Sequence, residues 1–190
     1  MRRNPFRRFL RDARAVAAVE FALILPLLVT LYFGTVEAAS LYTVDRRVAT
    51  VASTMADLVS REQTCITTDK LNSYFNAATG IMAPYPTTAL KQVVSFMSVG
   101  STGTVTIKWS KPYGTGATAR TVGVTTILAN ATTAAQINTL ARTKGWLVAA
   151  EIQYPYMPLY GVVIKTINLA HTEYFLPRYE TEITTAATCP

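Results

Sequence analysis

The sequence has little of what catalytic and metal sites are built from. Its 190 residues contain one histidine, His171, and two cysteines, Cys65 and Cys189. Zinc sites need clustered cysteine and histidine ligands, and general acid–base catalysis needs a proton carrier with an oriented partner. A phosphate-binding glycine loop followed by lysine and a G-x-S-x-G motif are also missing. We therefore expect a protein that is not an enzyme and that holds no metal or cofactor.

Isolated polar residues in the last third of the chain are expected to be structural. His171 falls in a strand pattern without an obvious partner. Glu151 and Glu173 also fall in predicted strands, where they either face each other or lie at solvent-facing cross-strand positions; the second interpretation needs no special role. Tyrosines crowd this region, and a sheet core is favoured over a binding surface for them. They are Tyr154, Tyr156, Tyr160, Tyr174 and Tyr179.

Basic residues are concentrated at the N-terminus rather than spread over a domain. The net charge is +7, and residues 1–14 alone carry six arginines against one aspartate. A hydrophobic segment follows at once, so the positive-inside rule explains the cluster better than a nucleic-acid partner does. Four of these arginines are expected to hold the N-terminus in the cytoplasm: Arg7, Arg8, Arg11 and Arg14.

A long apolar segment, 16–41, dominates the N-terminal part. As a helix it spans roughly 39 Å at about 1.5 Å per residue, enough to cross a bilayer. Pro26 is expected to kink or loosen this helix, because proline removes one backbone donor. Glu37 lies near the outer end, where it can reach headgroups or water. Glu20 lies close to the basic cluster, toward the cytoplasmic side, where a charge costs less than at the bilayer centre.

The helix is expected to continue beyond the membrane. Apolar residues recur at spacings of mostly three and four from Leu41 to Val59, which is typical of an amphipathic helix that packs on a partner surface. Glycine and proline are absent between Thr35 and Arg61. We predict one helix from about Ala15 to Arg61. Its polar face is expected to hold Asp45, Arg46, Arg47, Thr50, Asp57 and Arg61.

The rest of the chain is predicted to form a β-rich head, 65–190. One short helix is expected from Thr67 or Thr68 to Gly80, and another over TAAQINTLARTKG, ending at Gly145. Short turns between strands favour an antiparallel sheet. The fold class is thus α+β, with a leader (1–15), a membrane-spanning helix (16–41), an amphipathic extension (42–64) and the head. Strands are expected at 93–99, 104–110, 121–128, 146–154 and 161–175.

Both cysteines lie in the part that is expected to be translocated. An oxidising compartment favours a disulfide between Cys65 and Cys189, which would tie the C-terminal tail to the end of the long helix. The alternative is two free thiols.

Three interpretations compete for the N-terminal signal. A cleaved secretory signal peptide would release a chain starting near Ala39, but the apolar stretch is long for one and contains Glu20. A plain membrane anchor explains the length and the charge bias, but not Glu20. A signal of the prepilin type would be cut on the cytoplasmic side, before the apolar stretch.

The stretch RRFLRDARAVAAVEFALILPLL resembles the start of TadE-like pseudopilins, minor pilins of the tight-adherence (Tad/Flp) type IV pilus system. In these bitopic bacterial proteins a basic run and a small residue precede four mostly small residues, a glutamate, an aromatic residue and an apolar helix. Here Ala15 takes the place before the cut, where glycine is usual, and Val16–Val19, Glu20 and Phe21 follow. The segments EIQYPYMPLYG and YFLPRYE are similar to the family's weaker C-terminal pattern.

The resemblance implies a pilin-like fold and a role for Glu20. Prepilin peptidase would cut between Ala15 and Val16 and leave a new amino group on Val16. In an assembly, the Glu20 carboxylate of one subunit would pair with the amino group of its neighbour, so that both charges are buried together. Otherwise Glu20 reaches the inner membrane interface or pairs with its own Arg14.

The resemblance also implies a function and partners. The protein would act in assembly or priming of an Flp-type pilus and so support surface attachment. Its partners would be prepilin peptidase, the inner-membrane assembly platform, other major and minor pilins, and membrane lipid. It would lie in the bacterial inner membrane with its N-terminus in the cytoplasm and its head in the periplasm, or in the extracellular pilus. The alternative is a membrane-anchored or secreted adhesive or binding module outside any pilus.

Overall fold

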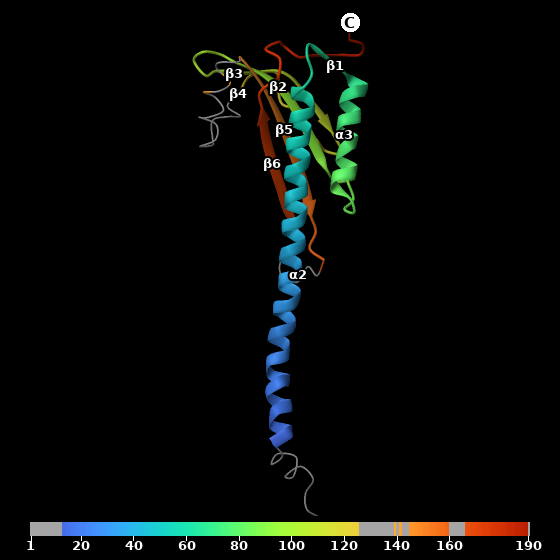
Figure 1. Ribbon diagram of the computed structural model, residues 1–190, viewed down its shortest axis with the longest axis vertical. Helices are drawn as coiled ribbons and strands as arrows, with labels where there is room; N and C mark the ends of the chain where they lie inside the picture. The colour runs from blue at the N-terminus through green and yellow to red at the C-terminus, as the bar shows by residue number, and fades with distance from the viewer. Residues whose placement is uncertain (1–12, 126–138, 140, 142–144, 160–165, 190) are drawn as a thin grey trace, which may run out of the picture.

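Figure 1 shows a computed structural model of the chain. The structure describes residues 13–125, 139, 141, 145–159 and 166–189. The leader arginines Arg7, Arg8 and Arg11 lie outside the described residues, and so does most of the segment in which the second short helix is expected.

A single helix, α2 (Ala13–Ser60), runs the length of the molecule (Figure 1). The prediction of one long helix is confirmed. The helix passes through Pro26 without a break, and the Thr30 hydroxyl donates to the Pro26 carbonyl at 2.8 Å. The kink expected at Pro26 stays a prediction.

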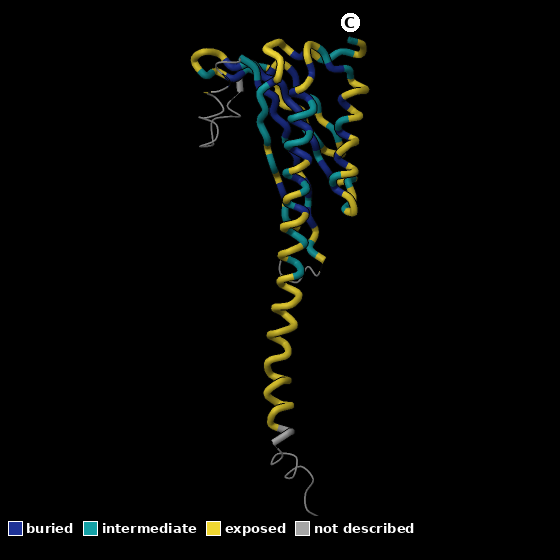
Figure 2. The backbone as a smooth tube through the Cα atoms, viewed as in Figure 1, coloured by how far each residue is buried: buried dark blue, intermediate teal, exposed yellow. Residues whose placement is uncertain are grey.

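The environment of α2 changes along its length (Figure 2). Residues 16–35 are all exposed, whereas buried residues recur from Val44 onward. This second half packs against strands β5 (Trp146–Tyr156) and β6 (Ile167–Phe175) and helix α3 (Thr68–Met82). The predicted apolar stripe is therefore confirmed as the contact surface of the head. Its buried members are Val44, Val48, Val51, Ala52, Met55, Ala56 and Val59.

The head is built on a five-stranded antiparallel sheet in the order β4-β3-β2-β5-β6. Alternate residues of a strand face opposite sides. Thus Val148 and Ala150 join the core under the helices, while Leu147 and Ala149 join a second cluster on the other face. The α+β class and the antiparallel sheet agree with the prediction. The strands are β2 (Lys91–Val99), β3 (Val105–Tyr113), β4 (Gly123–Thr125), β5 (Trp146–Tyr156) and β6 (Ile167–Phe175).

Helix α3 (Thr68–Met82) begins as predicted and ends later. The Thr67 hydroxyl caps it by accepting from the Lys70 backbone N–H at 3.2 Å. The end expected at Gly80 is wrong, because Gly80 has no positive φ and stays within the helix. Proline disfavours a helical conformation in the residue before it, so Pro84 ends the helix instead.

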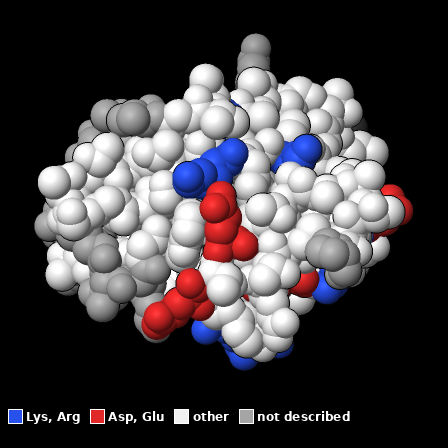
Figure 3. Space-filling model, turned by 90° about the horizontal axis from the view of Figure 1, so that it is seen from above, with Lys and Arg blue, Asp and Glu red and all other residues white. Residues whose placement is uncertain are grey.

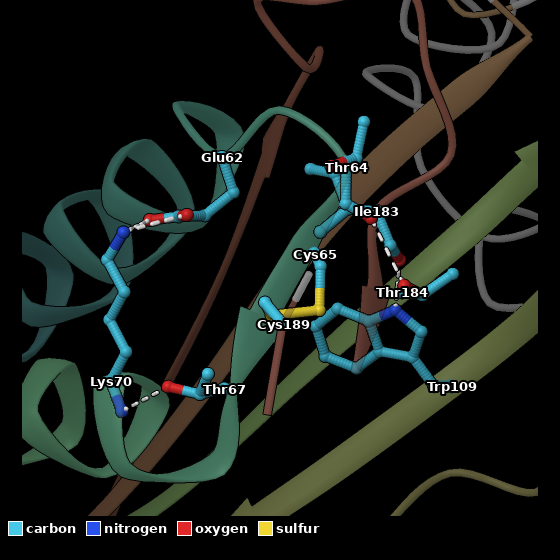
Figure 4. Close-up of a disulfide and its surroundings, with 9 residues drawn as sticks. All are labelled: Glu62, Thr64, Cys65, Thr67, Lys70, Trp109, Ile183, Thr184 and Cys189. Atoms are coloured by element: carbon cyan, nitrogen blue, oxygen red, sulfur yellow. Dashed lines mark hydrogen bonds and ion pairs between the residues drawn. A yellow bond between two sulfur atoms is a disulfide. The ribbon is translucent and has the colours of Figure 1, made fainter. Parts of the chain in front are cut away.

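The C-terminal tail is fastened to the end of α2. The structure joins Cys65 to Cys189 in the expected disulfide, with the Cα atoms 5.7 Å apart (Figure 4). A parallel pair of short strands, β1 (Cys65–Thr67) and β7 (Thr184–Ala186), lies beside it. The Trp109 indole N–H donates to the Ile183 carbonyl at 2.6 Å and holds the same segment against the sheet. Sequence reasoning missed this pair of strands.

Candidate functional site

The exposed half of α2 carries the residues expected to act in processing and assembly. The Ala15–Val16 peptide bond lies in the first turn of the helix, which begins at Ala13. Val16 is 51% exposed and Phe21 is 60% exposed. Glu20 is exposed as well, and its spacing of four from Val16 puts both residues on one helix face, about one turn apart. An amino group created at Val16 would therefore lie on the same face as the Glu20 carboxylate.

The surface of this half is almost wholly apolar. Leucines, valines and aromatic residues are exposed on all sides of the helix, and α2 is long and apolar enough to cross a membrane by its length and composition. Contiguous apolar surface of this extent marks a site of contact with lipid or protein. The most exposed large residues are Leu23, Leu27, Leu31 and Tyr32.

Glu37 marks the junction between the two halves of α2. It is half-buried, and its Oε1 accepts from the Tyr156 hydroxyl at 3.0 Å and from the Leu159 backbone N–H at 2.9 Å. The head thus supplies two donors to Glu37, and the expectation that this residue can reach headgroups or water stays a prediction. Burial, and then the hydrogen bond and charge of Glu37, raise the pKa of Tyr156 to about 12. The phenol therefore keeps its proton to a higher pH than an ordinary tyrosine does.

Two of the side chains expected on the polar face, those of Asp45 and Arg47, also contact the head. Asp45 Oδ1 lies 2.7 Å from His171 Nε2 on β6. Arg47 Nη1 donates to the Ile81 carbonyl at 2.7 Å. These contacts agree with a structural role for His171. They show that the flanks of the stripe, and not only its apolar centre, hold the helix to the head.

Glu62 forms a small polar cluster where α2 leads into β1 and α3. The Lys70 ammonium lies 2.8 Å from one of its carboxylate oxygens, and the Tyr74 hydroxyl donates to it at 2.5 Å. The hydrogen bond with Glu62 raises the pKa of Lys70, and burial raises that of Tyr74. Figure 4 shows Lys70 and Glu62 near the disulfide. These contacts hold the segment between α2 and β1 to helix α3, close to the disulfide that joins the C-terminal tail.

One of the two interpretations of Glu151 and Glu173, that they face each other, is wrong. The strand register places it opposite Thr172, while Glu173 lies opposite Ala150, so the two glutamates do not face each other. The Glu151 side chain is only 12% exposed and pairs with Arg120, whose Nε donates to Oε2 at 2.8 Å. The hydrogen bond to Glu151 raises the pKa of Arg120. The carboxylate is thus a half-buried partner in a salt bridge.

The tyrosines divide between core and surface. Tyr154 and Tyr156 are buried, which agrees with the core reading, and Tyr174 packs partly against the second cluster. Tyr179 is 45% exposed. Tyr160 lies outside the described residues.

Charged side chains are sparse on the end of the head far from the exposed helix (Figure 3). In this view acidic and basic side chains lie next to one another in small groups, so the described residues on this face form no continuous basic surface. Across the part of the chain that the structure describes, no group of three or more histidine, cysteine or acidic side chains is placed to hold a metal ion.

Most of helix α2 matches a known protein family. Residues 15–57 match the family model described as TadE-like protein. The match begins at Ala15, the residue before the candidate cut, and covers both the exposed half of α2 and most of the packed half. No curated protein and no solved structure matches the chain. Over residues 15–57, helix α2 is therefore similar to TadE-like proteins.

Proposed function

We propose that this protein is a minor pilin or pseudopilin that acts in the assembly or priming of a tight-adherence (Flp-type) pilus, and so supports surface attachment. The observation that carries the proposal is the division of α2. One half is exposed and apolar on all sides, and the other half is held by the head, while the TadE-like match covers both. A helix of this kind suits a subunit that leaves the membrane for a helical assembly, because apolar neighbours can replace lipid around it.

Glu20 is the proposed pairing group. A charge at the bilayer centre costs about 2.5–3.5 kcal/mol on insertion scales. Cleavage before Val16 would create a positive amino group on the same face of the helix as this carboxylate. Within a bundle of such helices, the carboxylate of one subunit would pair with the amino group of the next, and Phe21 would pack beside the pair. The pairing would also set the register between neighbouring helices.

The proposed topology follows from the charges and the disulfide. The leader 1–15 stays in the cytoplasm, the segment 16–41 spans the bacterial inner membrane, and the head lies in the periplasm or on the assembled pilus. The disulfide supports this placement, since such bonds persist in oxidising compartments. The proposed partners are prepilin peptidase, the assembly platform, other pilins and membrane lipid.

The mature N-terminus tests this proposal directly. Intact-mass measurement of the protein purified from its own membranes should give a chain that starts at Val16. A chain that starts near Ala39 would mean a released module, and an uncut chain would mean a plain anchor. The structure argues against release, because a chain that starts near Ala39 would begin within α2. It would also lack Glu37, which the head binds.

Variants at Glu20 test the pairing. Glu20→Ala should leave the protein in the membrane but abolish piliation, whereas Glu20→Asp, which keeps the carboxylate, should retain part of it. Thr30→Ala is a matched control, because it removes a polar group from the same exposed half without changing charge. Normal pilus numbers with Glu20→Ala would refute the pairing role, and loss of the protein from the membrane would point to an effect on insertion.

A further inference from the structure

The segment that follows β5 lies at the end of the head nearest the exposed half of α2 (Figure 1). Beyond the buried Tyr156, two large apolar side chains project from it. Met157 and Leu159 are each 74% exposed, among the most exposed large apolar residues in the part of the head that the structure describes. Figure 2 shows this exposed tip beside the point where α2 emerges from the head. Segment 156–159 carries no charged side chain.

Glu37 fixes the height of this segment along α2. The Leu159 N–H and the Tyr156 hydroxyl both donate to Glu37 Oε1, at 2.9 Å and 3.0 Å. Met157 lies between these two attachment points in the chain. The segment therefore lies at the level of Glu37, just beyond the last fully exposed turn of the helix.

This level coincides with the outer edge of the membrane core. A hydrocarbon core of about 30 Å corresponds to roughly 20 helical residues. Counted from Glu20, the first charge of the apolar half, the core ends near residue 40. Glu37 would then lie at the edge of the hydrocarbon, where a carboxylate needs hydrogen-bond donors from the protein because water is scarce. Tyr156 and Leu159 supply those donors.

We propose that Glu37 holds segment 156–159 against the membrane and that Met157 and Leu159 insert into the outer leaflet. The head would thus have a lipid contact of its own besides α2. Its exposed apolar side chains lie at the level of Glu37, directly after the exposed apolar residues 16–35 along α2, which makes lipid the occupant best supported. Tyr156 would lie at the interface with its ring buried in the head and its hydroxyl on Glu37, as amphipathic rings do at this depth. The contact would fix the tilt of the head on the membrane before assembly.

This inference rests on the membrane anchorage in the proposed function and is independent of pilus incorporation. Its test uses the full chain in vesicles of phosphatidylethanolamine and phosphatidylglycerol. Met157→Cys and Leu159→Cys are labelled singly with an environment-sensitive fluorophore, since the disulfide protects both native cysteines. Lipids that carry a nitroxide quencher at a shallow or a deep position report the depth of the label.

Two control positions make the result specific. They are Leu27→Cys and Val122→Cys, labelled in the same way. Leu27 is 67% exposed on the apolar half of α2, and Val122 is 65% exposed before β4, at the opposite end of the sheet. Labels at 157 and 159 should lose most of their emission to the shallow quencher, the label at 27 to the deep quencher, and the label at 122 to neither. If labels at 157 and 159 behave like the label at 122, the lipid contact is wrong while anchorage stands. If the label at 27 also escapes quenching, anchorage itself is wrong, and both proposals fall.

Two variants of Glu37 test whether this residue holds segment 156–159 in place. Glu37→Ala removes the acceptor and should reduce quenching at position 157 toward the value at 122. Glu37→Gln keeps an acceptor oxygen of similar position and should retain the quenching. Unchanged quenching with Glu37→Ala would overturn the role of Glu37. Emission at 157 that depends on the protein-to-lipid ratio, without quenching by lipid, would mean that a second copy covers the segment, and would overturn the lipid contact.

Discussion

The two halves of α2 belong to one uninterrupted helix and contrast in their surroundings. Residues 16–35 are apolar on all sides and exposed, whereas from Val44 to Val59 only one stripe is apolar, and that stripe is buried. A helix with an all-round apolar surface needs an apolar environment, while a helix with a single stripe needs one partner surface. Within this chain the second half finds its partner in the head. The first half must find its partner outside the molecule.

The contrast separates folding from assembly. Substitutions in the packed half should change the stability of the head, and substitutions in the exposed half should change membrane or subunit contacts. The stability of the head can be measured by unfolding the protein with denaturant in detergent micelles.

The largest effect is expected from the disulfide. Cys65 and Cys189 are 124 residues apart, and chain entropy gives such a cross-link about 4–5 kcal/mol. The double variant Cys65→Ser/Cys189→Ser should lower the free energy of unfolding by up to about this amount, as followed by tryptophan fluorescence. Membrane insertion should be unaffected, because the disulfide lies in the head and not in the exposed half of α2. An unchanged midpoint of unfolding would show that β1, β7 and Trp109 hold the tail without it.

A matched pair of truncations compares the halves directly. Met55 is 2% exposed in the packed half, and Leu27 is 67% exposed in the other. Met55→Ala should destabilise the head by about 2–5 kcal/mol, the usual cost of emptying a core position. Leu27→Ala should leave the denaturant midpoint of the head unchanged. Equal effects of the two substitutions would mean that the halves do not fold as separate regions.

Two neighbouring arginines in the packed half differ in their contacts with the head. Arg47 donates to the Ile81 carbonyl and lies over the Tyr85 ring, although its Nε is buried without a hydrogen-bond partner. Arg46 is exposed, and its side chain contacts Tyr42 of its own helix. Arg47→Met should cost about 1–2 kcal/mol of the free energy of unfolding, and Arg46→Met less than about 0.5 kcal/mol. An equal loss with Arg46→Met would show that the lost charge, and not the contact with Ile81, sets the effect.

The features that could be predicted from the sequence depend on local periodicity. The bounds of α2, its stripe and the strands follow from spacings of three to four or of two residues. The TadE-like character of the helix follows from the order of residues between Ala15 and Phe21, and the family match bears it out.

The features that were missed depend on residues far apart in the chain. The three-residue strands β1 and β7 are too short to leave a pattern, and their register depends on the path of the whole head. Glu37 appears in the sequence as a charge at the end of an apolar run, and nothing near it indicates that Tyr156, 119 residues later, donates to it. Arg120 and Glu151 likewise come together only through the order of the strands.

The smallest effect is expected at the junction of the two halves. Tyrosine ionises near pH 10 in an unfolded chain, whereas the pKa of Tyr156 is raised to about 12 by burial and by Glu37. Between these values the unfolded state loses a proton that the folded state keeps, so the contribution of Tyr156 is complete below pH 10 and is lost as the pH rises toward 12. The wild type should therefore lose more stability over this range than Tyr156→Phe does. Because burial is the larger cause, Glu37→Gln should keep most of the wild-type slope. Equal slopes in the wild type and Tyr156→Phe would mean that the head does not enclose the Tyr156 hydroxyl at the junction of the two halves.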